Sequence, residues 1–282
     1  MTPDPLAEPD LVTALRRAGC VFAEDEARLL MEQAAGPGQL AELVARRCAG
    51  EPLQQVLGWA QFCGLRVQLL PGVFVPRRRT ELLVRLAAVL VRGVGRGGTV
   101  GRSGAAGPGG PPVMVEPPVV VDLCCGSGAI GLALADRAGP VALTAVDIDP
   151  VAVRCAAANL ERVGGVAVQG DLFQPLSDRL LGRVDLVLAS PPYVPTDAIA
   201  LMPPEARLHE PAVALDGGPD GLALVRRVAA AVRPWLAPGG HLLAEFSAAQ
   251  APEAASIMAG SGLRARVIRS EALDATVIVA TP

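Results

Sequence analysis

The chain has 282 residues, of which 51% are hydrophobic and 19% are charged. This length and apolar share exclude a disordered chain and favour one large domain beside a small one. The 28 acidic residues outnumber the 25 basic ones and give a formal charge of -3, which argues against nucleic-acid binding driven by phosphate contacts, although a local basic patch remains compatible with it.

The beginning of the chain, residues 1–10, is acidic and Pro-rich, unlike a secretory signal. No apolar run approaches the ~20 residues that cross a bilayer. The six cysteines include no Cys-x-x-Cys pair and no grouping with zinc-finger spacing. These features predict a cytoplasmic protein with free thiols, no membrane partner and no metal site.

The front of the chain is predicted to be helical. Apolar residues recur at helical spacing over 11–58, with a break at 36–38. A β-hairpin is expected over 61–75 and a further helix over 80–91. The Gly/Pro-rich stretch 93–118 is predicted to be a flexible insertion.

From residue 119 onward, apolar strands alternate with helices. The expected strands are 119–123, 141–146, 166–169, 184–189 and 241–246, and the expected helices are 129–137, 150–162 and 222–236. Two further β-rich runs, 263–269 and 276–280, could pair antiparallel. This alternation predicts an α/β fold whose parallel sheet is covered on both faces.

The first chemical motif directly follows a strand and opens a helix. It consists of Asp122, Leu123, Cys124, Cys125, Gly126, Ser127 and Gly128. Small residues let the backbone pass close under a ligand, and the helix offers free N–H groups. Asp147, at the end of the next strand, could accept hydrogen bonds from a ribose, so the pattern indicates an adenosine-containing cofactor.

Three interpretations of this motif are open: a dinucleotide site, an S-adenosyl-L-methionine site, or a turn with a structural role alone. Gly126, Gly128 and Gly131 match the dinucleotide spacing, but Asp122 stands directly before the turn. A carboxylate there suits the amino group and sulfonium of S-adenosyl-L-methionine better than a pyrophosphate. The remaining alternative is a tight turn that binds nothing.

The second motif, Ser190-Pro191-Pro192-Tyr193, ends the fourth strand and should face the same crevice as the cofactor turn. Two prolines fix φ and remove two N–H donors, which leaves carbonyl acceptors for a substrate –NH2 group. Tyr193 can pack on a planar group, and catalysis would rest on orientation rather than on a charged base. The alternative is an ordinary Pro-Pro turn.

At these residues the chain resembles the class I S-adenosylmethionine-dependent methyltransferases, and within them the protein-(glutamine-N5) methyltransferases of peptide chain release factors. The resemblance runs from about Glu51 to the C-terminus, interrupted by the insertion. The blocks that carry it, besides the two motifs, are 51–58, 62–65, 74–77, 80–83, 210–211, 214–218 and 220–222.

The resemblance implies a Rossmann-like seven-stranded methyltransferase sheet at 76–282, a helical substrate-binding domain at 1–60 and a hairpin connector at 61–75. It implies that Asp171 and Leu172 join the cofactor site, with Asp171 near the adenine. The Ser190 to Tyr193 tetrad would hold the glutamine of a Gly-Gly-Gln loop. The products would be S-adenosyl-L-homocysteine and N5-methylglutamine.

Several positions depart from the family pattern. Ser190 replaces the usual Asn, Cys124 replaces a Gly, and Leu172 stands where an aromatic residue is common. Arg78 and Arg79 replace a Pro and an acid. The Gly after the fifth strand is also missing, because Glu245-Phe246-Ser247 follows there.

Two alternatives follow from these departures. One is a nucleic-acid amino-methyltransferase, since Ser-Pro-Pro-Tyr also occurs in enzymes that methylate flipped cytosines. Its only obvious phosphate contact is the cluster Arg77-Arg78-Arg79, and no target-recognition domain is evident. The other is a protein that binds the cofactor without turnover.

Overall fold

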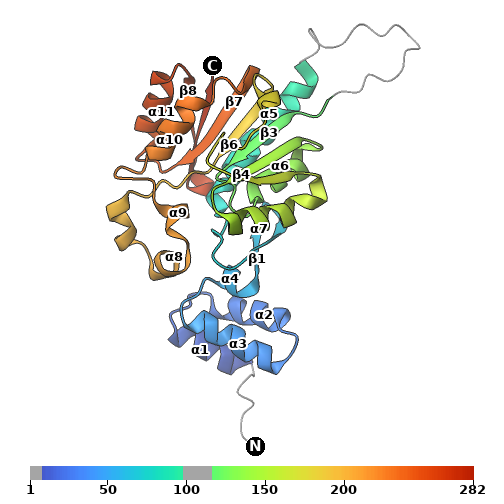
Figure 1. Ribbon diagram of the computed structural model, residues 1–282. Helices are drawn as coiled ribbons and strands as arrows, with labels where there is room; N and C mark the ends of the chain where they lie inside the picture. Colours follow the sequence, from blue (N-terminus) through green and yellow to red (C-terminus); the bar gives the residue numbers. More distant parts are fainter. Residues whose placement is uncertain (1–7, 98–115) are drawn as a thin grey trace, which may run out of the picture.

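The computed structural model describes residues 8–97 and 116–282. Its centre is a seven-stranded sheet in the order β5-β4-β3-β6-β7-β9-β8, in which β9 alone runs opposite to the other six strands (Figure 1). The strands are β3 Val119–Leu123, β4 Ala142–Asp147, β5 Val166–Gln169, β6 Val184–Ala189, β7 Leu236–Phe246, β8 Arg264–Ser270 and β9 Ala275–Thr281. The predicted Rossmann-like α/β sheet is confirmed, as is the antiparallel pairing of the last two strands.

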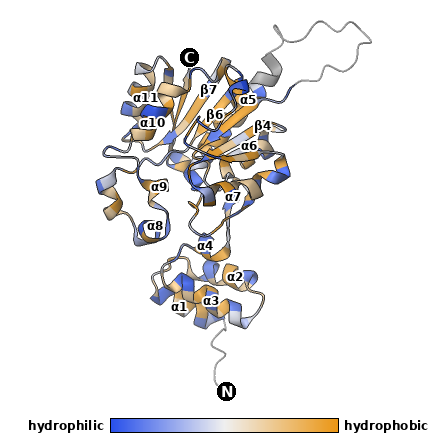
Figure 2. Ribbon diagram, viewed as in Figure 1, coloured by the Kyte–Doolittle hydropathy of each residue, from blue (hydrophilic) through white to orange (hydrophobic). Residues whose placement is uncertain are grey.

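Helices cover both faces of this sheet. They are α5 Glu81–Gly97, α6 Ala129–Ala138 and α7 Pro150–Leu160 on one face, and α10 Ala223–Ala231 and α11 Ala251–Gly260 on the other. Side chains alternate along a strand, so Val120 packs toward the α5 and α6 face while Val121 packs toward α10 and α11. Figure 2 shows the hydrophobic residues concentrated on the central strands.

The N-terminal helices form a unit with its own cluster of buried residues. They are α1 Glu8–Arg17, α2 Ala23–Gln33, α3 Pro37–Cys48 and α4 Leu53–Leu57. The predicted break is confirmed, because α3 begins with a proline after Gly36. Figure 1 shows this unit at the end of the molecule, joined to the sheet through α4 and β1.

The hairpin is shorter than predicted and begins earlier. It pairs β1 Trp59–Phe62 with β2 Leu65–Gln68, and residues beyond β2 run as an extended link rather than as a strand. The link packs onto α7, since Val73 and Val75 share a buried cluster with Cys155.

Two segments differ from the expected elements. Helix α5 follows a 3-10 turn η1, Arg78–Thr80, and extends to Gly97, so it includes the start of the predicted insertion. The rest of that insertion lies outside the described residues. Helix α11 was not predicted, and neither were the three short elements between β6 and α10, namely η4 Thr196–Leu201, α8 Pro204–His209 and α9 Ala212–Leu215. Within the described residues, no helix combines the length and apolar composition needed to cross a membrane.

Candidate active site

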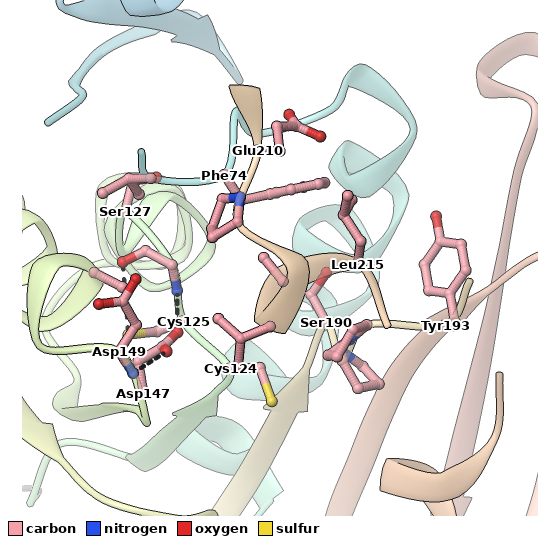
Figure 3. A pocket seen from close by; sticks show the side chains of 18 of the residues that line it. Phe74, Cys124, Cys125, Ser127, Asp147, Asp149, Ser190, Tyr193, Glu210 and Leu215 are labelled. Atoms are coloured by element: carbon pink, nitrogen blue, oxygen red, sulfur yellow. Dashed lines mark hydrogen bonds between the residues drawn. The ribbon is translucent and has the colours of Figure 1, made fainter. Parts of the chain in front are cut away.

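A cavity of about 740 Å³ opens where the carboxyl ends of β3, β4 and β6 meet. The strand order reverses between β3 and β6, and such a switch point is where ligands bind in open parallel sheets. The lining comes from the cofactor turn, Asp147, residues 170–172 and the tetrad, together with the connector and the segment 202–216. Figure 3 shows Asp147 and Tyr193 at opposite sides of the region, with Ser190 between them.

The cofactor turn presents bare backbone to this cavity. Gly126 has φ 54°, and a Cβ built on it would meet no atom within 4 Å. Cys124 takes the same left-handed region with φ 55°, where the family pattern has a glycine. The N–H of Cys125 donates to the Val146 carbonyl at 3.1 Å, which fixes the turn against β4. The ligand-facing surface is therefore backbone and small side chains.

Asp147 is the carboxylate that closes the cofactor side. Its Oδ2 accepts from the N–H of Gly126 at 2.8 Å, and its Oδ1 accepts from the N–H of Asp149 at 3.0 Å. Burial raises the pKa of Asp147, while these two N–H groups lower it. Each carboxylate oxygen has a further lone pair, so the hydroxyls of a ribose fit here.

Asp171 and Leu172 form the far wall of the same compartment. Asp171 is half-buried and pairs with the Arg227 guanidinium at 2.6 Å. Leu172 is 8% exposed and supplies an apolar surface that suits a planar base. The Asp147 carboxylate can accept from the ribose hydroxyls, and Leu172 offers an apolar surface for the base. Together they fit an adenosine group.

Two predicted cofactor residues do not line the cavity. Asp122 is 0% exposed, and the alternation of side chains along β3 turns it toward α6, where its Oδ2 accepts from the N–H of Gly131 at 3.1 Å. Gly128 lies under the turn, and a Cβ there would come 3.1 Å from Ala156. Asp122 and Gly128 therefore support the turn on its side facing α6 and α7, away from the cavity.

The Asp122 carboxyl has a consequence for stability. Burial raises its pKa from 3.8 to about 7, and its Oδ1 has no hydrogen-bond partner within the described chain. A raised folded-state pKa means that the folded chain binds more protons, so this carboxyl makes the protein less stable as pH rises from 3.8 to about 7.

We expect Asp122→Asn to remove this part of the pH dependence, as measured by thermal denaturation across that interval without cofactor. Asp136→Asn, on the exposed side of α6, is the control and should leave the pH dependence unchanged. An Asp122→Asn variant with the wild-type slope would contradict this account.

The tetrad directly follows β6 and lines the cavity. The N–H of Ser190 donates to the Leu123 carbonyl at 3.4 Å, which joins it to the cofactor strand. Within residues 8–97 and 116–282, no hydrogen bond reaches the carbonyls of Ser190, Pro191 or Pro192. The Tyr193 carbonyl is occupied, because Gln250 Nε2 donates to it at 2.8 Å. Three carbonyls thus stay available for a donor.

Charged residues that the motifs did not indicate also line the cavity. Glu210, in the segment 202–216, pairs with Arg77, just beyond the connector, and is buried. Burial raises the pKa of Glu210, and the Arg77 charge lowers it. Glu245 of β7 is buried beside Tyr193. Glu210 belongs to a block of the family resemblance but had no predicted role, and Glu245 had been noted only beside the missing Gly after the fifth strand.

Comparisons with known proteins agree with this geometry. Residues 114–218 match the family model for the methyltransferase small domain. A release factor glutamine methyltransferase from Geobacter sulfurreducens is 36% identical over 222 residues, 78% of this chain and 69% of the relative. A 4-amino-L-phenylalanine/4-methylamino-L-phenylalanine methyltransferase from Streptomyces pristinaespiralis is 33% identical over 226 residues, 80% of this chain and 71% of the relative.

The fold has a counterpart among solved structures. A methyltransferase from Pyrococcus furiosus superposes with a TM-score of 0.52 at 14% identity, over 85% of this chain and 97% of that one. At this identity the likeness concerns the fold alone, and it agrees with the sheet described above.

Proposed function

Since the chain belongs to the release factor glutamine methyltransferases, we propose that it methylates the side-chain amide nitrogen of the glutamine in the Gly-Gly-Gln loop of a peptide chain release factor. The observation that carries the proposal is the set of unpaired carbonyls at Ser190, Pro191 and Pro192, which lie in the same cavity as the Asp147 carboxylate. The products would be N5-methylglutamine and S-adenosyl-L-homocysteine.

The cofactor is S-adenosyl-L-methionine, which supplies an electrophilic methyl group on a sulfonium when bound. Asp147 would hold its ribose, Gly126 and Cys124 would pass beneath it, and Leu172 would pack on its adenine. The tetrad would accept the amide N–H bonds of the substrate and aim the nitrogen at the methyl group.

We assign a separate role to each domain of the chain as part of the same proposal. The helical unit 1–60 would hold the protein substrate, 61–75 would connect it, and 76–282 would carry the chemistry. Two contacts support this, because Pro52 reaches the cavity lining and Arg47 of α3 lies 3.7 Å from Glu205 of α8. A release factor acts on the ribosome, so the reaction would take place in the cytoplasm.

Methyl transfer from labelled cofactor to a purified release factor tests the proposal directly. We expect label on the glutamine of the Gly-Gly-Gln loop and none when that glutamine is replaced. Duplex DNA serves as the comparison substrate, and label on DNA with none on the release factor would refute the proposal. Cofactor binding without transfer to either substrate would favour the non-catalytic alternative.

A second candidate substrate is the amino group of a small aminoaryl amino acid. The relative named for 4-amino-L-phenylalanine motivates it, together with Ser190, which leaves more room than Asn. Arg79 lines the cavity and forms no ion pair within the described chain, so its guanidinium could receive the carboxylate of a free amino acid. Adding 4-amino-L-phenylalanine to the transfer assay separates the two candidates.

Replacing Ser190 by Asn should preserve glutamine methylation or raise it about fivefold, because the longer side chain can form one more neutral hydrogen bond, worth ~1 kcal/mol. The measurement is kcat/KM for the release factor, with Ser190→Ala as the control that removes the hydroxyl. A Ser190→Asn variant that no longer methylates the release factor would show that the serine serves a different acceptor.

A further inference from the structure

Glu245 is a buried carboxylate in the cavity wall that the proposed reaction does not yet use. It is 2% exposed and belongs to β7. β6 and β7 run parallel with Ala189 beside Ala244, so Ser190, which directly follows β6, stands at the same level as Glu245 of β7. The carboxylate therefore adjoins the first residue of the tetrad.

One oxygen of this carboxylate is in contact with Tyr193, and the other accepts no hydrogen bond from the described residues, although the Thr80 hydroxyl lies close enough to the carboxylate to lower its pKa. Tyr193 Oη lies 3.4 Å from Oε1, whereas Oε2 is buried and has no hydrogen-bond partner anywhere in 8–97 or 116–282. Leaving a buried carboxylate oxygen unpaired is costly, so a donor that arrives in the cavity would be bound favourably.

The surroundings of Glu245 come from several elements. Burial raises its pKa, while the hydroxyl of Thr80, the charge of Arg79 and the hydroxyl of Tyr193 lower it. The facing residue of β9, Val277, brings no charge. Burial also raises the pKa of Tyr193 to about 12, so this hydroxyl stays protonated and can donate to Oε1.

We infer that Oε2 of Glu245 accepts an N–H bond from the substrate amino group, beside the carbonyl of Pro191. An amide –NH2 has two donors, and a long carboxylate can supply the acceptor that the short Ser190 side chain does not reach. This assignment rests on the proposed function, because it concerns the acceptor half of the same cavity. It adds a charged acceptor to a site that the sequence indicated would work through neutral groups alone.

The test is Glu245→Gln, which keeps the side-chain volume and turns one acceptor into a donor. We expect kcat/KM for the release factor to fall about 10- to 100-fold, as for loss of a hydrogen bond to a charged group. The affinity for S-adenosyl-L-homocysteine, measured by calorimetry, should stay within about twofold, because Tyr193, which contacts Glu245, and Asp147 lie on opposite sides of Ser190 (Figure 3). Glu253→Gln, exposed on α11, is the matched control.

Acid sensitivity gives a second readout. Wild-type turnover should fall as pH drops through the raised pKa of Glu245, because protonation removes the acceptor. The Glu245→Gln profile should lack this acid limb, and Glu245→Asp should restore part of the rate.

Unchanged kcat/KM in Glu245→Gln would overturn the inference, as would an equal loss of cofactor affinity, which would mark a structural role. A wild-type protein that is inactive on the release factor would instead overturn the proposed function. The same variants are then compared with 4-amino-L-phenylalanine, whose amino group would meet the same acceptors.

Discussion

Replacing Asp147 by Ala should weaken cofactor binding about 100-fold. The change removes the carboxylate that would accept from the ribose hydroxyls at the end of β4, and two hydrogen bonds to a charged group contribute roughly 3 kcal/mol or more. It also frees the N–H groups of Gly126 and Asp149, which Asp147 now holds. Calorimetry with S-adenosyl-L-homocysteine measures the loss.

Tyr193→Ala is the matched comparison for this variant. Tyr193 lies at the opposite side of the cavity, so its removal should reduce turnover while cofactor affinity is largely kept (Figure 3). An equal loss of cofactor affinity in both variants would contradict the separation of the cavity into a cofactor half and an acceptor half.

Gly221→Ala should abolish most of the turnover and cost about 3 kcal/mol of stability. Gly221 has φ 75°, and a Cβ there would overlap the Tyr193 carbonyl oxygen and Nε2 of Gln250. The Gln250 amide can move aside, but the Tyr193 carbonyl is backbone, so the overlap must displace the tetrad, and overpacking of this kind costs about 1–3 kcal/mol beyond the backbone strain.

Gly239→Ala provides the control. Gly239 has φ 79°, nearly the same backbone strain, but a Cβ there meets nothing within 4 Å. Thermal denaturation and kcat of the two variants should therefore differ by the steric contribution alone. Equal losses of stability and of kcat in both variants would mean that the contact between Gly221 and the tetrad does not matter for either property.

The sheet could be predicted from the sequence because its strands are continuous apolar runs. Strands β3, β5 and β6 have the predicted bounds. β7 begins at Leu236, earlier than expected, because its first half contains Pro and Gly and lacks the apolar pattern. The short helices α8 and α9 follow prolines and are too brief to show a period, so that wall of the cavity could not be predicted.

The family and its methyltransferase chemistry, predicted from the motif blocks, are confirmed by the relatives. The individual site residues were harder to place. Sequence order puts Asp122 next to the turn, but the strand period turns its side chain to the opposite face of β3. The position of Glu245 beside the tetrad follows only from the pairing of β6 with β7, which are far apart in the sequence.

A single buried carboxamide joins the hairpin to the cofactor turn. Asn159 of α7 is 6% exposed, and its Nδ2 donates to the carbonyls of Gln68 and Ser127, both at 2.9 Å, while its Oδ1 accepts from the N–H of Gln68 at 2.9 Å. One side chain therefore fixes the edge of the hairpin relative to the backbone beneath the cofactor. Any motion that separates Gln68 from Ser127 has to break these hydrogen bonds first.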